Sequence, residues 1–222
     1  MIRNFETPSK KKMKIYFSMK DLDEATYILG IRIYRDRVRR LIGLTQDTYL
    51  EKVLKRFNME NSKKGSLSMV HSKPLSKMHC PQKDAERESM RKIPYASAIG
   101  SILYAIIRTR PDVLYALSVA SRYQSDPRSL HWAAVKNILK YFRRTKNMFL
   151  AYGGGEKQEL VARGYTDASF TTDPNDFKSK SGYVFTLNGG AVSWKSSKQD
   201  TIADSATEVE YITSSEAAKE MI

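Results

Sequence analysis

The residues best suited to chemistry are one aspartate at the end of a strand-like run and two glutamates in a later helix-like run. Asp167 follows Gly164-Tyr165-Thr166, and Glu208 and Glu210 lie some forty residues on. An Asp on a strand that faces a Glu on a helix is what a magnesium-dependent nuclease needs, because two metal ions can then clamp the attacking and leaving oxygens of a phosphodiester. The pattern therefore favours hydrolysis of a nucleic acid.

The spacing around the two glutamates leaves their roles open. Ser205 and Glu208 fit a capping box, with Ser at the cap and Glu at the third helical position, and this would give Glu208 a structural role. Thr207 is an alternative cap, in which case Glu210 would take the structural position. The cap pattern alone does not choose between them.

The elements around these acids are predicted by alternation and turn residues. Val161, Tyr165 and Asp167 share one face of a strand, with Ala162 and Ala168 on the other. Two further strands follow, one carrying Tyr183, Phe185 and Leu187 and one carrying Val192 and Trp194. The Asn188-Gly189 pair between them is a strong hairpin signal. The sequence therefore predicts a three-strand meander followed by a helix.

Charge is distributed unevenly along the 222 residues, whose net charge is +14. Residues 1–150 hold 31 Lys and Arg against 13 Asp and Glu, whereas residues 151–222 hold 7 against 11. A basic body supplies affinity for nucleic acid without reading its sequence; the alternative is an ordinary solvated basic surface. The candidate nucleic-acid-binding residues are Arg35, Arg37, Arg39, Arg40, Lys52, Lys55, Arg56, Lys136, Lys140, Arg143 and Arg144.

These cations lie on predicted elements of the basic part. The pattern predicts a strand over Tyr27–Arg35, a charged turn over Arg35–Arg40 and a second strand over Leu41–Leu44, joined as a hairpin. A helix capped by Thr45 follows, and its basic face either contacts nucleic acid or is simply solvated. Asn61–Ile93 is predicted to be a long loop that wraps the surface or is partly flexible.

Three helices with apolar stripes then predict a helical packing unit. The first carries Ile99, Ile102 and Ile106. The second starts again at Thr109-Arg-Pro-Asp, with Pro111 in its first turn. The third carries Trp132, Val135, Leu139 and Phe142, and Trp132 is expected to be a core residue more than a platform for stacking bases.

Several classes of protein are excluded by composition. Cys80 is the single cysteine, so an internal disulfide cannot form, and a reducing, intracellular compartment is expected. No run of eighteen apolar residues is present, so no membrane contact is expected. One cysteine and three scattered histidines leave no zinc cluster.

Longer stretches resemble the Pol polyproteins of Copia-type LTR retrotransposons, from about Lys20 to the end. The matching segments follow the family's order, and they are Tyr27–Ile33, Tyr95–Tyr104, Thr109–Val113, His131–Tyr141, Tyr165–Phe170, Lys180–Phe185, Ala191–Gln199 and Glu208–Ile212. The resemblance implies an α+β chain with the C-terminal, thumb-like region of a reverse transcriptase in 1–152. It implies an incomplete ribonuclease H-like α/β module in 153–222. The glycines Gly153-Gly154-Gly155 and the change in charge favour a boundary there.

The resemblance also implies site residues and partners. The family's Ala-Glu-Tyr pattern matches Val209-Glu210-Tyr211, so Asp167 and Glu210 would be the catalytic carboxylates and metal ligands, with Mg²⁺ as the cofactor of the intact family. The partners would be an RNA–DNA hybrid or duplex and the remainder of Pol. The compartment would be a cytoplasmic virus-like particle or the nucleus.

Activity of the chain alone is not expected. No Tyr-x-Asp-Asp polymerase motif is present, and the two later aspartates of such ribonucleases H are not matched in this sequence. We therefore expect a Pol fragment that is catalytically inactive by itself and keeps its nucleic-acid-binding surface. The alternatives are a non-catalytic nucleic-acid-binding protein and a ribonuclease H completed by another chain.

Overall fold

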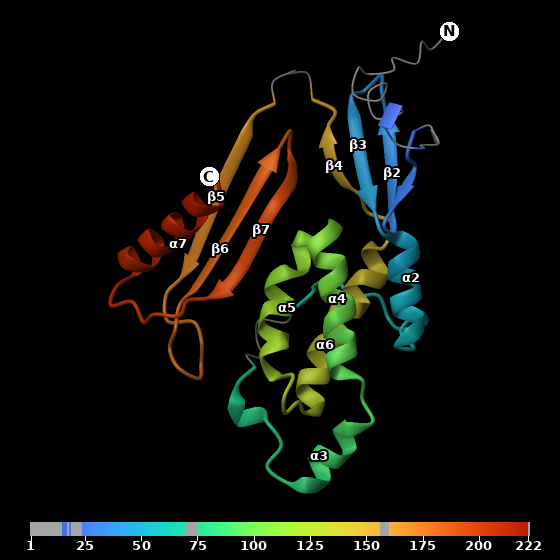
Figure 1. The fold of residues 1–222 in the computed structure, drawn as a ribbon. Helices are drawn as coiled ribbons and strands as arrows, with labels where there is room; N and C mark the ends of the chain where they lie inside the picture. The colour runs from blue at the N-terminus through green and yellow to red at the C-terminus, as the bar shows by residue number, and fades with distance from the viewer. Residues whose placement is uncertain (1–14, 17, 19–23, 70–74, 156–159, 222) are drawn as a thin grey trace.

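The chain folds into two antiparallel sheets and a set of packed helices, as expected for an α+β protein (Figure 1). The structure is a computed structural model that describes residues 15–16, 18, 24–69, 75–155 and 160–221. The expected polar arm at the N-terminus lies outside the described residues.

The first sheet has the strand order β1-β2-β3-β4 and is antiparallel throughout. Its strands are β1 (Tyr27–Ile28), β2 (Ile31–Asp36), β3 (Leu41–Thr45) and β4 (Leu150–Gly153). The hairpin of β2 and β3 is confirmed. The single strand predicted over Tyr27–Arg35 is wrong, because Leu29 and Gly30 both have positive φ, 49° and 78°, and form a two-residue turn between β1 and β2.

The helical core packs below the first sheet and beside the second (Figure 1). Its helices are α2 (Asp47–Arg56), α4 (Tyr95–Thr109), α5 (Leu114–Ala120) and α6 (Ser129–Thr145). The apolar stripe of α6 is at its centre, with Val135 and Phe142 completely buried. Trp132 is partly buried and packs against this core beside Phe57 and Tyr95, as expected of a core residue.

Two expectations for the basic part are wrong. Thr45 is the buried last residue of β3, and α2 is instead preceded by Gln46, whose side chain makes no capping hydrogen bond. The stretch 61–93 is not all loop, because it forms the short 3-10 helix η1 (Lys77–His79) and the helix α3 (Asp84–Arg91). Within α3 only Met90 is buried, so its sequence carries almost no apolar stripe from which it could be predicted.

Arg110 holds the end of α6 to the start of the short 3-10 helix η2 (Pro111–Val113). Its guanidinium donates to both oxygens of Asp112, at 3.0 and 2.7 Å, and to the hydroxyl of Thr145 at 2.7 Å. It also lies 4.7 Å from the ring centre of Phe142. These contacts tie the last turn of the buried helix to the segment between α4 and α5.

The second sheet is the predicted three-strand meander. Its strands β5 (Ala162–Ser169), β6 (Lys180–Leu187) and β7 (Gly190–Lys198) are antiparallel in the order β5-β6-β7. Asn188 and Gly189 have φ of 48° and 81°, so the predicted two-residue hairpin turn is confirmed. The predicted helix follows as α7 (Ala206–Glu220) and packs on β5 and β6 (Figure 1).

β4 also touches the second sheet. The Tyr152 hydroxyl donates to the carbonyl of Ala191 at 2.7 Å, and the Gly153 amide donates to the carbonyl of Asn188 at 2.9 Å. A Cβ at Gly190 would come within 2.3 Å of the Tyr152 ring, so this close approach requires glycine. The domain boundary at residues 152 and 153 stays a prediction. In the described segments, none of the helices combines the length and apolar character that crossing a membrane requires.

A buried histidine predicts how stability depends on pH. The His131 side chain is completely buried, its Nδ1 accepts from the Arg128 amide at 3.0 Å, and its ring stacks on Tyr123 at 4.2 Å. Burial lowers the pKa of His131 from its ordinary value of 6.5. The unfolded chain therefore takes up this proton at a higher pH than the folded chain, and stability falls as the pH drops below about 6.5.

We expect the free energy of unfolding, measured by urea titration between pH 7.5 and 5, to decrease by at most about 1.4 kcal/mol per pH unit through this group. His131→Gln removes the titrating group, so its profile should be flatter over the same range. Equal slopes for the two proteins would show that His131 does not control this pH dependence.

Candidate nucleic-acid interface

A basic groove lies between the helices α2 and α6. Its volume is about 590 Å³, and five cationic side chains outnumber two carboxylates along it. The lining residues are Glu51, Leu54, Lys55, Glu60, Lys64, Arg143, Arg144, Lys146 and Asn147. Residues some ninety positions apart in the sequence therefore build one electropositive surface.

Packing in the helical core brings the two walls of the groove together. Leu54 of α2 and Leu139 and Phe142 of α6 belong to the same buried cluster, which leaves the polar sides of the helices next to each other. An ion pair of 2.5 Å between Lys146 and Glu51 crosses the groove. Both of its side chains are partly exposed, so the pair adds little to stability and mainly orients the two groups.

Gly65 brings a third segment to the groove. Its amide donates to the carbonyl of Lys140 at 3.0 Å. A Cβ at this position would lie 3.0 Å from the Lys140 Cβ and 3.2 Å from the Tyr141 amide nitrogen, so only glycine approaches α6 this closely without displacing it. The contact places the preceding residue, Lys64, on the groove wall.

The predicted basic residues divide between the groove and other surfaces. Lys55, Arg143 and Arg144 line the groove. Four others do not: Lys52, Arg56, Lys136 and Lys140. Lys136 and Lys140 precede Arg144 at steps of four residues, so they form a stripe on α6 that leads to the groove. Lys64 was missed, although the Lys63-Lys64-Gly65 sequence, two cations before a glycine, was a signal.

The four arginines near the β2–β3 turn lie elsewhere. The tip of this hairpin is at the opposite end of β3 from α2, as Figure 1 shows. Arg35 and Arg37 both pair with Glu24, and Arg39 pairs with Asp36 at 3.7 Å. Internal carboxylates therefore balance part of the charge at the tip. The groove, with five cations against two carboxylates, has the larger excess of positive charge.

Such a groove is suited to binding phosphate groups. Guanidinium groups donate in a fork that matches two phosphate oxygens, and ammonium groups add point charge. Five of the nine lining side chains are cationic, and one, Asn147, is an amide. The arrangement therefore favours contact with a phosphate backbone over readout of sequence.

Asp167 lies on β5 opposite Gly182 of β6. Cross-strand neighbours share a face of the sheet, so Asp167 is on the face that also carries Ser196 of β7. That face looks toward α5, since Ser196 approaches Ser118 with 3.5 Å between their hydroxyl oxygens. The helix α7 packs on the opposite face, where Thr213 donates to Ser181 at 2.9 Å.

The two glutamates of α7 differ in their surroundings. The Ser205 hydroxyl accepts from the Glu208 amide at 3.2 Å, and the Glu208 carboxylate accepts from the Asp204 amide at 2.8 Å. Glu208 thus has the structural role expected of a capping residue, although it reaches the residue before the cap. Glu210 is exposed, as is Asp167, and no hydrogen bond or ion pair joins them within the described residues.

The described residues contain no group of three or more His, Cys, Asp or Glu side chains placed to hold a metal ion. Asp167 and Glu210 therefore do not make a complete two-ion site with their described neighbours, and no catalytic step follows from them. Their assignment as catalytic carboxylates and Mg²⁺ ligands stays a prediction.

Comparison with known proteins identifies the class. The chain belongs to the retrovirus-related Pol polyproteins of transposons, in agreement with the resemblance to Copia-type elements. No family model matches the chain, and no solved structure matches it.

Three relatives illustrate the match. The chain is 46% identical over 206 residues to the retrovirus-related Pol polyprotein from transposon TNT 1-94 of Nicotiana tabacum; these residues are 93% of this chain and 15% of that polyprotein. It is 32% identical over 214 residues, 96% of this chain, to a putative transposon Ty5-1 protein of Saccharomyces cerevisiae, of which it covers 66%. It is 44% identical over 133 residues, 60% of this chain, to secreted RxLR effector protein 161 of Plasmopara viticola, of which it covers 92%.

Proposed function

We propose that this chain is the C-terminal region of a reverse transcriptase followed by the first part of a ribonuclease H module, and that it grips an RNA–DNA hybrid or duplex through the basic groove. The observation that carries the proposal is the convergence of Lys55, Lys64, Arg143, Arg144 and Lys146 on one groove. Membership of the Pol family supports the choice of nucleic acid as the polyanion. The compartment would then be a cytoplasmic virus-like particle or the nucleus.

The binding would be electrostatic and without sequence preference. Each phosphate neutralised by a cation releases condensed counterions, so affinity falls steeply as salt rises. The stripe of Lys136 and Lys140 beside the groove would let the same backbone continue along α6. Glu51 and Glu60 would oppose binding, because they lie on the groove wall beside the cations.

We expect Arg143→Gln combined with Arg144→Gln to weaken binding of a labelled RNA–DNA hybrid. The slope of log affinity against log salt should fall by about 2, since each lost phosphate contact removes about 0.9. Glu51→Gln should strengthen binding at low salt. Fluorescence anisotropy over 50 to 200 mM salt measures the affinity of the unaltered chain, of the double arginine variant and of Glu51→Gln.

Lys92→Gln is the matched control, because Lys92 is exposed at the end of α3 and does not line the groove. The salt-dependence slope of this variant should equal that of the unaltered chain within experimental error. If removing Arg143 and Arg144 changes the slope no more than Lys92→Gln does, the groove is not the binding surface.

The nuclease part of the proposal concerns Asp167 and Glu210. Both carboxylates are exposed, whereas Glu208 is engaged at the start of α7, which supports Glu210 as the ligand. Because Asp167 is on the sheet face opposite to the one that α7 covers, we propose that Mg²⁺ binds the two carboxylates only when the rest of Pol or another chain brings them together and supplies further carboxylates, so that this chain alone is inactive. A chain without nuclease ancestry, which binds nucleic acid and never cleaves it, is the alternative.

The tobacco polyprotein supplies the segment to add, namely the one that follows its matched region. When this segment is fused to the C-terminus of the present chain, after Ile222, we expect Mg²⁺-dependent cleavage of the RNA strand in a hybrid. Asp167→Asn and Glu210→Gln should abolish this cleavage, and Glu208→Gln should not. Cleavage that survives Glu210→Gln but not Glu208→Gln would reverse the assignment of the two glutamates. Asp167-dependent cleavage by the unfused chain would contradict the proposed inactivity.

A further inference from the structure

Asp173 is a buried carboxylate in the loop between β5 and β6, and its side chain has no exposed surface. The loop folds around it: the Asn175 amide and side chain donate to Oδ1 at 2.9 and 3.0 Å, and the Phe177 amide donates to the Asp173 carbonyl at 2.9 Å. Thr171 and Phe177 have positive φ, 49° and 56°. Hydrogen bonds to Asp173 therefore hold the conformation of this loop.

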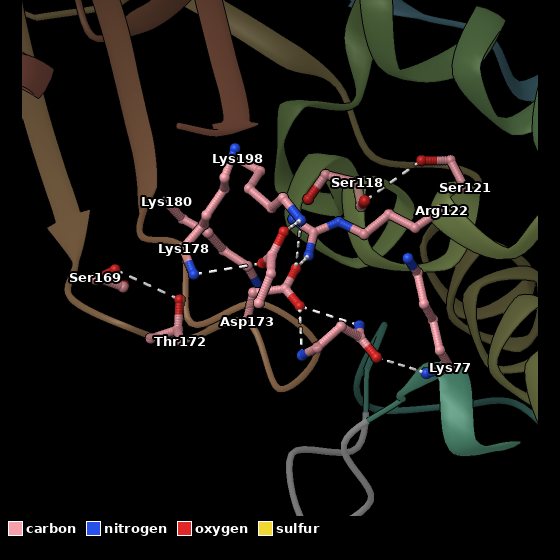
Figure 2. Close-up of polar contacts among 12 residues, drawn as sticks. Lys77, Ser118, Ser121, Arg122, Ser169, Thr172, Asp173, Lys178, Lys180 and Lys198 are labelled. Carbon is pink, nitrogen blue, oxygen red and sulfur yellow. Dashed lines mark hydrogen bonds and ion pairs between the residues drawn. The ribbon is translucent and has the colours of Figure 1, made fainter. Parts of the chain in front are cut away.

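The charge of Asp173 is balanced from outside its own loop. The Arg122 guanidinium, on the 3-10 helix η3 (Ser121–Tyr123) that follows α5, donates to Oδ2. The ammonium group of Lys198, at the end of β7, lies 3.3 Å from the same oxygen. Figure 2 shows Arg122 and Lys198 reaching Asp173 from two sides. One carboxylate thus joins the strand module, which we define as residues 160–221, to the helical core.

Other contacts between the strand module and the helices, along a boundary that we call the seam, are also polar. Lys180 lies 4.6 Å from the ring centre of Tyr115 and 3.3 Å from its hydroxyl. The side-chain oxygen of Asn175 accepts from the Lys77 amide at 2.7 Å. A crevice of about 480 Å³ runs beside Arg122 and Lys198, between α4 and α5 on one side and β7 on the other. Apolar packing therefore does not close the seam there.

We propose that Asp173 is a positioning residue that latches the strand module to the helical core. Through this contact, Asp173 fixes the position of the sheet face that carries Asp167 relative to the basic groove. This second part rests on the proposed function, whereas the latch itself does not. Polar interfaces between units of one chain permit relative motion unless specific contacts hold them. Removing one partner of a buried pair leaves the other charge uncompensated, so loss of Asp173 should loosen the contact between the two units at this end, while the contacts of β4 with the second sheet still hold the other end.

The ionisation of Asp173 supports the latch. Burial alone would raise the pKa of this carboxyl, but the Asn175 amide and the Arg122 and Lys198 charges together hold it below its ordinary value of 3.8. The neighbouring Asp176, which accepts from Lys198 at 2.6 Å, is the other carboxylate facing the same cation. Asp173 is therefore charged at neutral pH, and its contribution is lost only as the pH falls through the folded-state pKa.

The test measures the distance between the two units in the absence of nucleic acid. Lys92→Cys on the helical side and Ser214→Cys on α7, both at exposed positions, carry spin labels in a Cys80→Ser background. Double electron–electron resonance should give one narrow distance distribution for this reference chain. Asp173→Asn, which keeps the shape of the side chain and removes its charge, should broaden the distribution and add longer distances.

Asp176→Asn is the matched control, because Asp176 lies in the same loop and contacts the same lysine but does not contact Arg122. Its distribution should stay narrow. Arg122→Gln removes the partner on the helical side and should broaden the distribution even if Asp173→Asn does not fold. The double variant, Asp173→Asn with Arg122→Gln, should have a distance distribution no broader than that of the more affected single variant, since the two substitutions remove the same interaction.

A narrow distribution in both Asp173→Asn and Arg122→Gln, or equal broadening in Asp176→Asn, would overturn the latch. Binding of hybrid by Asp173→Asn is measured separately by anisotropy and should stay within about twofold of the reference, because none of the groove residues belongs to the strand module. If the reference chain itself fails to bind hybrid, the proposed function fails while the distance measurement still decides the latch.

Discussion

Burial of the apolar side of α6 is the interaction on which the rest of the structure depends. Val135, Ile138, Leu139 and Phe142 are each at most 1% exposed, and burying a side chain of this size contributes about 1.5–3 kcal/mol. α2, α4 and α5 pack around this stripe, which leaves the polar side of α6 outside. The same helix leads into β4, the strand that completes the first sheet and touches the second. Without this burial, neither the groove nor the position of either sheet would be defined.

Local patterns predicted the elements that carry strong periodic or turn signals. The stripe of α6 and the Asn188-Gly189 turn are each set by residues within a few positions, and each was predicted correctly. The Ser205 cap was one of the two caps that the local pattern allowed. The misses have physical causes. The alternation over 27–35 continues through Leu29-Gly30, so the turn there is visible only from pairing of β1 with β2. Helix α3 has too few buried residues to show a stripe.

The candidate groove was predictable only in part, because it is a product of tertiary packing. Sequence reasoning identified Lys55, Arg143 and Arg144 as basic faces of separate helices, but nothing local indicated that these faces meet. It treated the hairpin arginines as equal candidates, whereas pairing with Glu24 and Asp36 balances part of their charge. The carboxylate Asp173 escaped notice altogether, since a single acid in a polar loop looks solvated until the packing around it is known.

The central claim is that α2, the Lys64–Gly65 segment and the end of α6 act as one surface for nucleic acid. Chemical-shift mapping of the ¹⁵N-labelled full chain, titrated with a short RNA–DNA hybrid, tests it most directly. The account predicts that amides of Lys55, Gly65, Arg144 and Lys146 shift together along one binding curve, and that those at the β2–β3 tip change little. Shifts confined to the tip or to α7, with the groove amides unmoved, would contradict it.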